Sequence, residues 1–338
     1  MKAYQIGPQT GIDGLTLVDR PDLVPGPGEA VLRVRAVCLN HRDLLIVAGG
    51  YGTKRAETRV PLSEGVGEVI AIGDGVTGVK VGDRAICPHF VTWLGGAFSP
   101  AAFGTDIGVT HDGWLAEQVR VPAAALVDVS GLSDDYAAPL ASSALTAWHA
   151  VVEVGRVKAG DTVLALGTGG VSIFALQLAK ASGARVAITS ASDAKLAAAR
   201  ALGADITINY RTTPGWAAEV NAATDGAGAD IVVETGGQAT LSQSIAAAAV
   251  NGRIVVIGGL AGAATGGLAN YGTIIGKNLT LRGIAEGSRA MLADLVRAMT
   301  ASTIAPVIDH TFAFAEAQAA YAYLKSGDHL GKVMITVP

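Results

Sequence analysis

Cysteine, aromatic residues and charge are all scarce in this chain. Its two cysteines, Cys38 and Cys87, form neither a disulfide framework nor a cysteine-rich zinc pattern. Charged residues make up 16% of the chain and the net charge is −4 without a basic block, which argues against nucleic acid or anionic membrane as partners. The most apolar stretch, 163–179, is broken by glycines, and the N-terminus lacks an apolar signal core. We therefore expect a soluble cytoplasmic protein.

Apolar residues and glycine are abundant instead. Apolar residues make up 50% of the chain, and its 44 glycines are spread among Val, Ile and Ala runs. This composition excludes a disordered, collagen-like or low-complexity protein. A length of 338 residues exceeds that of one ordinary core, so we expect two domains.

The residue pattern changes near position 124. Before it, short β-type runs such as AVLRVRAVCL and LAEQVRVP alternate with Gly, Pro and Asp turns, which predicts an antiparallel, barrel-like β-domain. After it, apolar strands alternate with helices, which predicts βαβ units and a parallel sheet. The predicted strands are 162–167, 185–190, 205–209, 228–237, 252–259 and 278–284. Two helical patterns and a terminal strand, KVMITV, end the chain, so we expect an α/β protein with one domain inserted in the other.

The loop GTGGVS (167–172) follows the first of these strands. Gly167 would permit a tight turn, and Gly169 would let the backbone approach a pyrophosphate. The helix that begins at Gly170 and Val171 would direct its free N–H groups at the anion, while Ser172 stands where a third glycine is common. Because the loop lies between a strand and a helix and opens a series of βαβ units, we expect it to bind a dinucleotide.

The end of the second strand bears on which dinucleotide is bound. An acid there would bind the ribose hydroxyls and repel a 2′-phosphate. Here the strand ends in small hydroxyl residues such as Ser190, and Asp193 is displaced into the next helix. Lys195, Tyr210 and Arg211 can neutralise and contact a phosphate. We therefore favour NADP(H), with NAD(H) as the alternative.

The stretch LSEGVGEVIAIGDGV (62–76) carries a further signature. Together with GTGGVS and VKVGDRA, its Glu64, Gly67, Gly73 and Val76 make the whole chain resemble the medium-chain dehydrogenase/reductase superfamily. This superfamily includes zinc alcohol dehydrogenases and zinc-free quinone or enone reductases. The resemblance implies a GroES-like β-barrel catalytic domain over 1–123 and 285–338, a Rossmann domain over 124–284, and a homodimer.

The resemblance also indicates where zinc ligands would lie in this chain. The catalytic ligands of zinc members would fall on Asn40, Ser63 and Ser142, which are weak neutral ligands where zinc needs thiolate, imidazole or carboxylate. The structural zinc lobe needs four close cysteines, and only Cys87 lies in that region. Lone histidines such as His89 more often form hydrogen bonds than metal sites. We therefore expect neither zinc.

Without zinc, hydride chemistry depends on protein hydrogen bonds to the developing oxyanion. In NHRD (40–43), Asn40, His41 and Arg42 are candidate donors, and the resemblance places His41 near the cofactor pyrophosphate. Arg42 cannot shuttle a proton at neutral pH, although it can stabilise an enolate or alkoxide. Tyr51 is a candidate proton donor or, alternatively, a loop aromatic that covers the cleft.

The resemblance implies further cofactor contacts. Thr146 and the pair Gly258–Gly259 would lie against the nicotinamide, and Lys332 would reach the cofactor phosphates. The segment 88–114 holds five aromatic residues and stands where zinc members carry the structural lobe. A loop of this length is usually functional, so we expect it to wall an apolar substrate cleft or to contact a second subunit.

Three functions remain open at this point. The leading one is a zinc-independent oxidoreductase that transfers a hydride between NADP(H) and a carbonyl or alcohol. The second is an NADPH-dependent enone or quinone reductase that acts on an activated C=C bond. The third, of another class, is a non-catalytic NADPH-binding protein.

Overall fold

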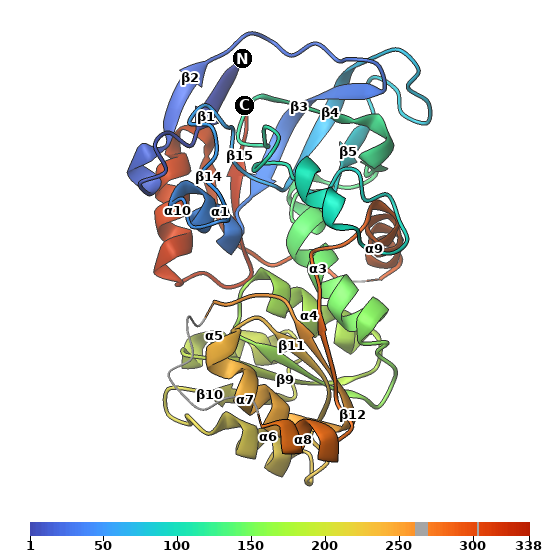
Figure 1. Cartoon of the computed structure of the whole chain (residues 1–338), viewed down its shortest axis with the longest axis vertical. Coiled ribbons are helices and arrows are strands. Elements are labelled where there is room, and N and C mark those ends of the chain that lie inside the picture. Colours follow the sequence, from blue (N-terminus) through green and yellow to red (C-terminus); the bar gives the residue numbers. More distant parts are fainter. Residues whose placement is uncertain (261–269, 303) are drawn as a thin grey trace. The chain divides into compact units, whose positions relative to one another are not determined.

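The computed structural model describes residues 1–260, 270–302 and 304–338, and these divide into two compact units (Figure 1). Unit 1 comprises Met1–Leu145 and Glu286–Pro338, and unit 2 comprises Thr146–Ala285. We expected the first boundary after 123. The following residues belong to unit 1 because β7 (Val127–Asp128) pairs with β5 (Arg84–Ile86).

Unit 1 is built on a mostly antiparallel sheet. Its strand order is β14-β15-β3-β4-β5-β7, with β6 also paired to β3, and β1 and β2 form a separate ribbon. The other strands of unit 1 are β1 (Lys2–Gln5), β2 (Thr16–Asp19), β3 (Glu29–Cys38), β4 (Gly65–Ile72), β6 (Gln118–Pro122), β14 (Ile308–Ala313) and β15 (Lys332–Thr336). The expected β-rich domain and its terminal strand are confirmed, whereas β14, which pairs in parallel with β15, was not predicted.

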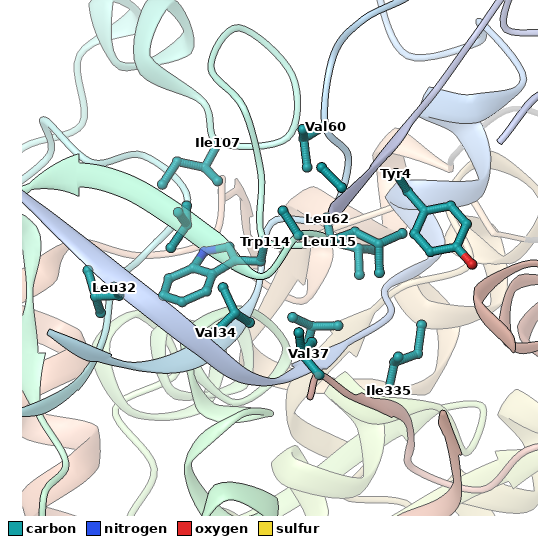
Figure 2. Close-up of a cluster of buried hydrophobic side chains, with 14 of the residues drawn as sticks. Tyr4, Leu32, Val34, Val37, Val60, Leu62, Ile107, Trp114, Leu115 and Ile335 are labelled. Carbon is teal, nitrogen blue, oxygen red and sulfur yellow. The ribbon is translucent and has the colours of Figure 1, made fainter. Parts of the chain in front are cut away.

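The core of unit 1 explains the spacing of the glycines in 62–76. Trp114 is fully buried and lies beside Leu32 and Val34 (Figure 2). A Cβ added at Gly65 would lie 2.9 Å from the Trp114 ring, and one at Gly67 would lie 2.7 Å from the Arg33 carbonyl oxygen. These glycines are therefore required by the close approach of the indole and of the neighbouring strand.

Unit 2 contains the six-stranded parallel sheet of a doubly wound fold. Its strand order is β10-β9-β8-β11-β12-β13. Successive strands are added on one side of β8 up to β10 and then on its other side from β11, so the topological switch point lies between β8 and β11. The strands are β8 (Thr162–Leu166), β9 (Arg185–Ser190), β10 (Ile206–Asn209), β11 (Ala229–Glu234), β12 (Ala248–Val256) and β13 (Thr280–Gly283). All six predicted strands are confirmed, and the fold directs ligands to the carboxyl edge of this sheet.

Helices flank the sheets of both units. Those of unit 1 are α1 (His41–Val47), α2 (Asp134–Ala137), α9 (Arg289–Ala301) and α10 (Ala317–Ser326), and those of unit 2 are α4 (Gly170–Ala181), α5 (Asp193–Ala201), α6 (Trp216–Ala223), α7 (Gln238–Ala247) and α8 (Tyr271–Gly276). α3 (Leu145–Trp148) lies between two π-helical turns, η4 (Leu140–Ala144) and η5 (His149–Val154). The short 3₁₀ turns are η1 (Ile12–Gly14), η2 (Pro100–Thr105), η3 (Ala123–Ala125) and η6 (Phe314–Glu316). Within the described ranges, every helix is too short or too polar to cross a membrane.

The aromatic segment 88–114 packs largely against itself. Phe98 lies 5.8 Å from Phe90, 5.0 Å from Trp93 and 5.4 Å from Phe103 between ring centroids. The carbonyl oxygens of Trp93 and Leu94 accept the N–H groups of Arg289 and Ala290, which fixes the segment to the start of α9. Its role at a substrate cleft or a subunit contact stays a prediction.

Helix α1 begins with a buried carboxyl group. Asp43 is fully buried, and its Oδ2 accepts the backbone N–H of Asn40 at 2.7 Å, which fixes the chain at the start of the helix. Its Oδ1 has no hydrogen-bond partner among the described residues. Burial raises the pKa of Asp43 to about 7, although Arg42, the Asn40 N–H and Lys332 act in the opposite direction.

This carboxyl group makes the stability of the protein depend on pH. Its pKa is about 7 in the folded protein and ~3.9 in the unfolded chain, so the folded state holds the proton more tightly and loses stability as pH rises through this window. Asp43→Asn keeps an acceptor for Asn40 and removes the titration. Relative to this variant, the wild-type protein should lose up to ~4 kcal/mol in free energy of unfolding between pH 4 and 8.

Urea unfolding at several pH values measures this difference. Asp19→Asn is the matched control, because it removes one carboxylate whose side chain is 87% exposed. A difference between wild type and Asp43→Asn that stays constant with pH would contradict the assignment.

Candidate active site

The glycine-rich loop of unit 2 leaves room for an anion at a helix N-terminus. Gly167 has φ 78°, which favours glycine, and Gly169 is the residue before α4. A Cβ added at Gly169 would meet no atom of the described residues within 4 Å, so packing within the protein does not demand glycine there. The free N–H groups of the first turn, which begins at Gly170 and Val171, attract a phosphate.

Ser172 shows why the third glycine of the usual pattern can be replaced. Its hydroxyl is buried and donates to the Leu166 carbonyl oxygen at 2.6 Å. Thr235 donates to the same oxygen at 2.9 Å. The serine therefore helps to fix the end of β8, the strand that leads into the loop.

The candidate 2′-phosphate residues gather at the ends of β9 and β10. Ser190 and Asn209 are paired across these strands, and Tyr210 and Arg211 follow directly. Asn209 donates to Asp193 Oδ1 at 2.7 Å and accepts the N–H of Arg211 at 3.0 Å. Asp193 is thus engaged by a side chain of the protein. The position of the cluster at the sheet edge suits the adenosine end of a dinucleotide.

A cavity of about 390 Å³ lies at the ends of β11 and β12, and Gly258 and Gly259 line it. Glu234 is also in its lining, and Glu234 Oε1 accepts the N–H groups of Gly236 and Gly237 at 2.8 Å. A Cβ added at Gly237 would lie 2.6 Å from Gly259 Cα, so glycine is required at this close approach. Glu234 was not predicted as a site residue, although an acidic residue at the end of a buried strand is a feature that the sequence displays.

In unit 1, a buried ion pair lies beside the first candidate catalytic residue. Lys332 Nζ is 2.8 Å from Glu64 Oε2, and the two side chains are 2% and 0% exposed. Nζ also donates to Asn40 Oδ1 at 2.7 Å, Ser143 Oγ at 3.0 Å and the Leu39 carbonyl oxygen at 2.9 Å. These four oxygens share the three N–H donors of the ammonium group. The contact with a cofactor phosphate that we expected of Lys332 stays a prediction.

The residues at the predicted catalytic zinc positions do not fit this metal. Asn40 is bonded to the Lys332–Glu64 pair, and the Ser142 N–H donates to Glu64 Oε1 at 3.1 Å. Ser63 Oγ is buried without a partner among the described residues. The described ranges contain no group of three or more His, Cys, Asp or Glu that could hold a metal. Neutral oxygens beside a fixed ammonium make a poor zinc site.

Two of the candidate catalytic residues, Arg42 and Tyr51, lie in contact. The Arg42 guanidinium carbon is 4.9 Å from the centroid of the Tyr51 ring. Arg42 Nη2 donates to both carboxylate oxygens of Asp106 at 2.7 Å. Arg42 Nε and Nη1 have no partner among the described residues. Burial raises the pKa of Tyr51, so its phenol stays protonated at neutral pH.

His89 and Glu286 form a second buried pair in unit 1. His89 Nδ1 contacts Glu286 Oε1, and the two side chains are 6% and 1% exposed. Burial raises the pKa of Glu286 well above its usual value and lowers that of His89. Both shifts favour the neutral form of each group. The backbone N–H of His89 donates to Glu286 Oε2 at 3.2 Å, whereas His89 Nδ1 has no hydrogen bond of acceptable geometry among the described residues. Glu286 was not predicted from the sequence.

The geometry does not fix the role of the remaining candidates. His41 begins α1 and is exposed, and partial burial of its ring lowers its pKa. Thr146 is buried in α3, and Lys195 supplies the N–H that the Ser192 hydroxyl accepts at 3.4 Å. The catalytic and cofactor roles of all these residues stay predictions.

Comparison with known proteins agrees with this fold. The profile described as zinc-binding dehydrogenase matches residues 170–301, and that described as alcohol dehydrogenase GroES-like domain matches residues 26–131. A zinc-type alcohol dehydrogenase-like protein of Schizosaccharomyces pombe is 41% identical over 316 residues, which cover 92% of this chain and 91% of that protein. An acryloyl-coenzyme A reductase of Metallosphaera sedula is 29% identical over 326 residues, which cover 93% of this chain and 94% of that protein. A crystal structure described as an NAD-dependent alcohol dehydrogenase has a TM-score of 0.90 at 32% identity and covers 100% of both chains.

These matches extend over both units and agree with the parallel sheet, the glycine-rich loop and the β-rich unit 1. The chain therefore belongs to the medium-chain dehydrogenase/reductase family of NAD(P)-dependent oxidoreductases.

Proposed function

We propose that this protein is a zinc-independent oxidoreductase that transfers a hydride between NADP(H) and a carbonyl or alcohol. The observation that carries this proposal is the Lys332 ammonium, which is bonded to Asn40 where the resemblance would place a zinc ligand. The site thus has a fixed positive charge of its own. Both cysteines are buried free thiols, which supports a reducing, cytoplasmic location.

The choice of NADP(H) rests on the ends of β9 and β10. An acid that faced the ribose would repel a 2′-phosphate, but Asp193 accepts a hydrogen bond from Asn209. Ser190, Tyr210 and Arg211 offer two hydroxyls and a cation at the same edge. The similarity to a protein described as NAD-dependent keeps NAD(H) as the alternative.

The residues of this chain would bind the cofactor and stabilise charge. Gly167, Gly169 and the first turn of α4 would hold the pyrophosphate, and Gly258 and Gly259 would lie against the nicotinamide. When bound, the nicotinamide supplies the hydride. The substrate carbon takes this hydride, and its oxygen becomes negative and then takes one proton from solvent or from a side chain.

Three side chains of unit 1 suit that oxygen. Asn40 Nδ2 gives one N–H to Glu64 at 2.7 Å and has a second N–H for the oxyanion. Arg42 keeps unpaired N–H groups on Nε and Nη1, which can stabilise the same charge. Tyr51, protonated at neutral pH, is the proton donor, and His41 is assigned to the cofactor pyrophosphate.

Reduction of an activated C=C bond is the second candidate function. It is favoured by the similarity to an acryloyl-coenzyme A reductase, because acryloyl-coenzyme A carries such a bond. In that reaction Asn40 and Arg42 would stabilise an enolate oxygen in place of an alkoxide. A non-catalytic NADPH-binding protein would need neither of these donors.

We also propose a homodimer through the edge of the unit 2 sheet. All four residues of β13 are exposed, and within the described ranges the strand pairs only with β12. Leu281 on β13 is 37% exposed, and Ile275 on the nearby α8 is 78% exposed. An exposed edge strand with apolar side chains is suited to pairing with a second copy.

A panel of acceptors tests the function. NADPH oxidation is followed with benzaldehyde, cyclohexanone, 2-cyclohexen-1-one and 1,4-benzoquinone, using protein purified without added metal and dialysed against a chelator. We expect turnover of an aldehyde or ketone, with substoichiometric zinc by elemental analysis. Activity on the C=C bond alone would select the second function, and tight NADPH binding without turnover would select the third. Stoichiometric zinc in the purified protein would contradict zinc independence.

The cofactor preference is tested with Arg211→Ala. Loss of one charge-assisted contact costs about 1.5–3 kcal/mol, so the Kd for NADPH should rise about 10–100-fold while that for NADH changes little. Fluorescence titration measures both constants. Arg185→Ala is the matched control, because Arg185 is an exposed residue at the opposite end of β9. An equal rise of both Kd values in Arg211→Ala would mean that Arg211 does not contact the 2′-phosphate.

The dimer is tested with Leu281→Glu, measured by size-exclusion chromatography with light scattering. The wild-type protein should have the mass of two chains and the variant the mass of one, because the charge would be buried against its own copy. Leu17→Glu changes an apolar residue of similar exposure, 41%, in unit 1 and should remain dimeric. A dimeric Leu281→Glu variant would place the interface elsewhere.

A further inference from the structure

Lys332 is the most completely enclosed cation that the described part of unit 1 shows. It is the first residue of β15, its side chain is 2% exposed, and its ammonium lies within 3.0 Å of four oxygens. One of these oxygens is charged, that of Glu64, so the pair is neutral as a whole. A buried ion pair that only stabilised the fold could be replaced as a whole by well-packed apolar side chains without loss of stability.

The ammonium is connected to the surface through one side chain. Asn40 Oδ1 accepts from Lys332 Nζ at 2.7 Å and from Ser143 Oγ at 2.8 Å. Asn40 Nδ2 donates to Glu64 Oε2 at 2.7 Å. Lys332, Glu64 and Ser143 are all buried, whereas Asn40 is partly exposed. The amide is thus held from both ends, and its second N–H is the donor left for a ligand.

We propose that Lys332, Glu64 and Ser143 are positioning residues for hydride transfer, which fix and polarise the Asn40 amide so that its second N–H stabilises the substrate oxyanion. This inference rests on the proposed function. It assigns a reaction role to Lys332 that differs from the cofactor contact implied by the resemblance. It also explains why positions 40 and 142 need no metal-binding side chains.

Two physical effects follow from the geometry. An ammonium that donates to the amide oxygen withdraws electron density from the nitrogen, so that the remaining N–H becomes a stronger donor. Bonds at both ends of the amide also prevent its rotation, so no reorganisation is needed when charge develops. Because the charge exists only in the transition state, loss of these effects lowers kcat more than it weakens substrate binding.

The test combines variants of Lys332 with a variant of Asn40. Lys332→Met removes the charge at similar volume, and Ser143→Ala removes one bond to Asn40 and leaves the ion pair intact. With NADPH and the acceptor of the panel that wild type reduces fastest, each should lower kcat, Lys332→Met by at least ~10-fold. KM and the Kd for NADPH should change less than ~2-fold. Lys325→Met, on the exposed end of α10, controls for the loss of a lysine.

The Asn40→Ala background separates positioning from a structural role. If Lys332 acts through Asn40, Lys332→Met has little further effect on kcat in Asn40→Ala, because the donor is already absent. An equal fractional loss of kcat in both backgrounds would overturn the proposal. If Lys332→Met does not fold, Ser143→Ala in both backgrounds makes the same comparison.

A measurement that needs no turnover completes the test. Selective ¹⁵N labelling of the six asparagines gives a small set of side-chain amide signals, and Asn40 is assigned by its loss in Asn40→Ala. The Asn40 amide proton that is bonded to Glu64 should exchange slowly with solvent. The chemical shift of this amide should change in Lys332→Met. An unchanged signal would overturn the positioning role. If wild type reduces none of the acceptors, the proposed function fails, and this signal still decides whether Lys332 controls Asn40.

Discussion

A buried ammonium needs oxygen partners, and unit 1 is arranged to supply them. Lys332 receives them from Leu39 and Asn40 at the end of β3, from Glu64 before β4 and from Ser143 in η4. Breaking such a pair on one side costs about 3–5 kcal/mol, because the other charge is left buried and alone. The pair thus fixes four segments to one point, and the Asn40 amide, which we propose to be catalytic, is one of the groups at that point.

Unit 1 holds two further buried pairs of ionisable side chains, Arg42 with Asp106 and His89 with Glu286. Arg42 has Asp106 as its carboxylate partner, so the guanidinium stays charged inside the protein. The pKa of Glu286 is raised and that of His89 lowered, both mainly by burial, so burial favours the neutral form of each group. Unit 1 therefore encloses a compensated cation next to Tyr51. Under the proposed function, its field would favour an oxygen that becomes negative during the reaction without attracting a permanent anion.

The sequence predicted the fold well where a local pattern dictates structure. The Rossmann strands were found because buried parallel strands are continuous apolar runs, and β9 ends at the residue expected. β14 was missed because most of its residues are exposed and only Ile308 and Phe312 give it a weak apolar face. The candidates Asn40, Arg42 and Tyr51 came from residue chemistry near a known motif. Ser143 and Lys332, the partners of Asn40, are brought together by pairing of distant strands and turns, which local spacing does not encode.

The family profile is described as zinc-binding, but the residues at the metal-ligand positions of this chain fit zinc poorly. Replacing metal ligands singly would leave unsatisfied groups around a dry pocket, which costs about 1–3 kcal/mol for each. A lysine introduced beside intact ligands would repel the metal, since two unit charges 4 Å apart interact by ~4 kcal/mol near a protein surface and a divalent ion doubles this. The neutral residues Asn40, Ser63 and Ser142 and the ammonium of Lys332 are therefore compatible with each other and fit zinc poorly. Under the proposed function, the positive group at this site is an ammonium that neither dissociates nor responds to chelators, and its effect on the substrate depends on the geometry of a single amide.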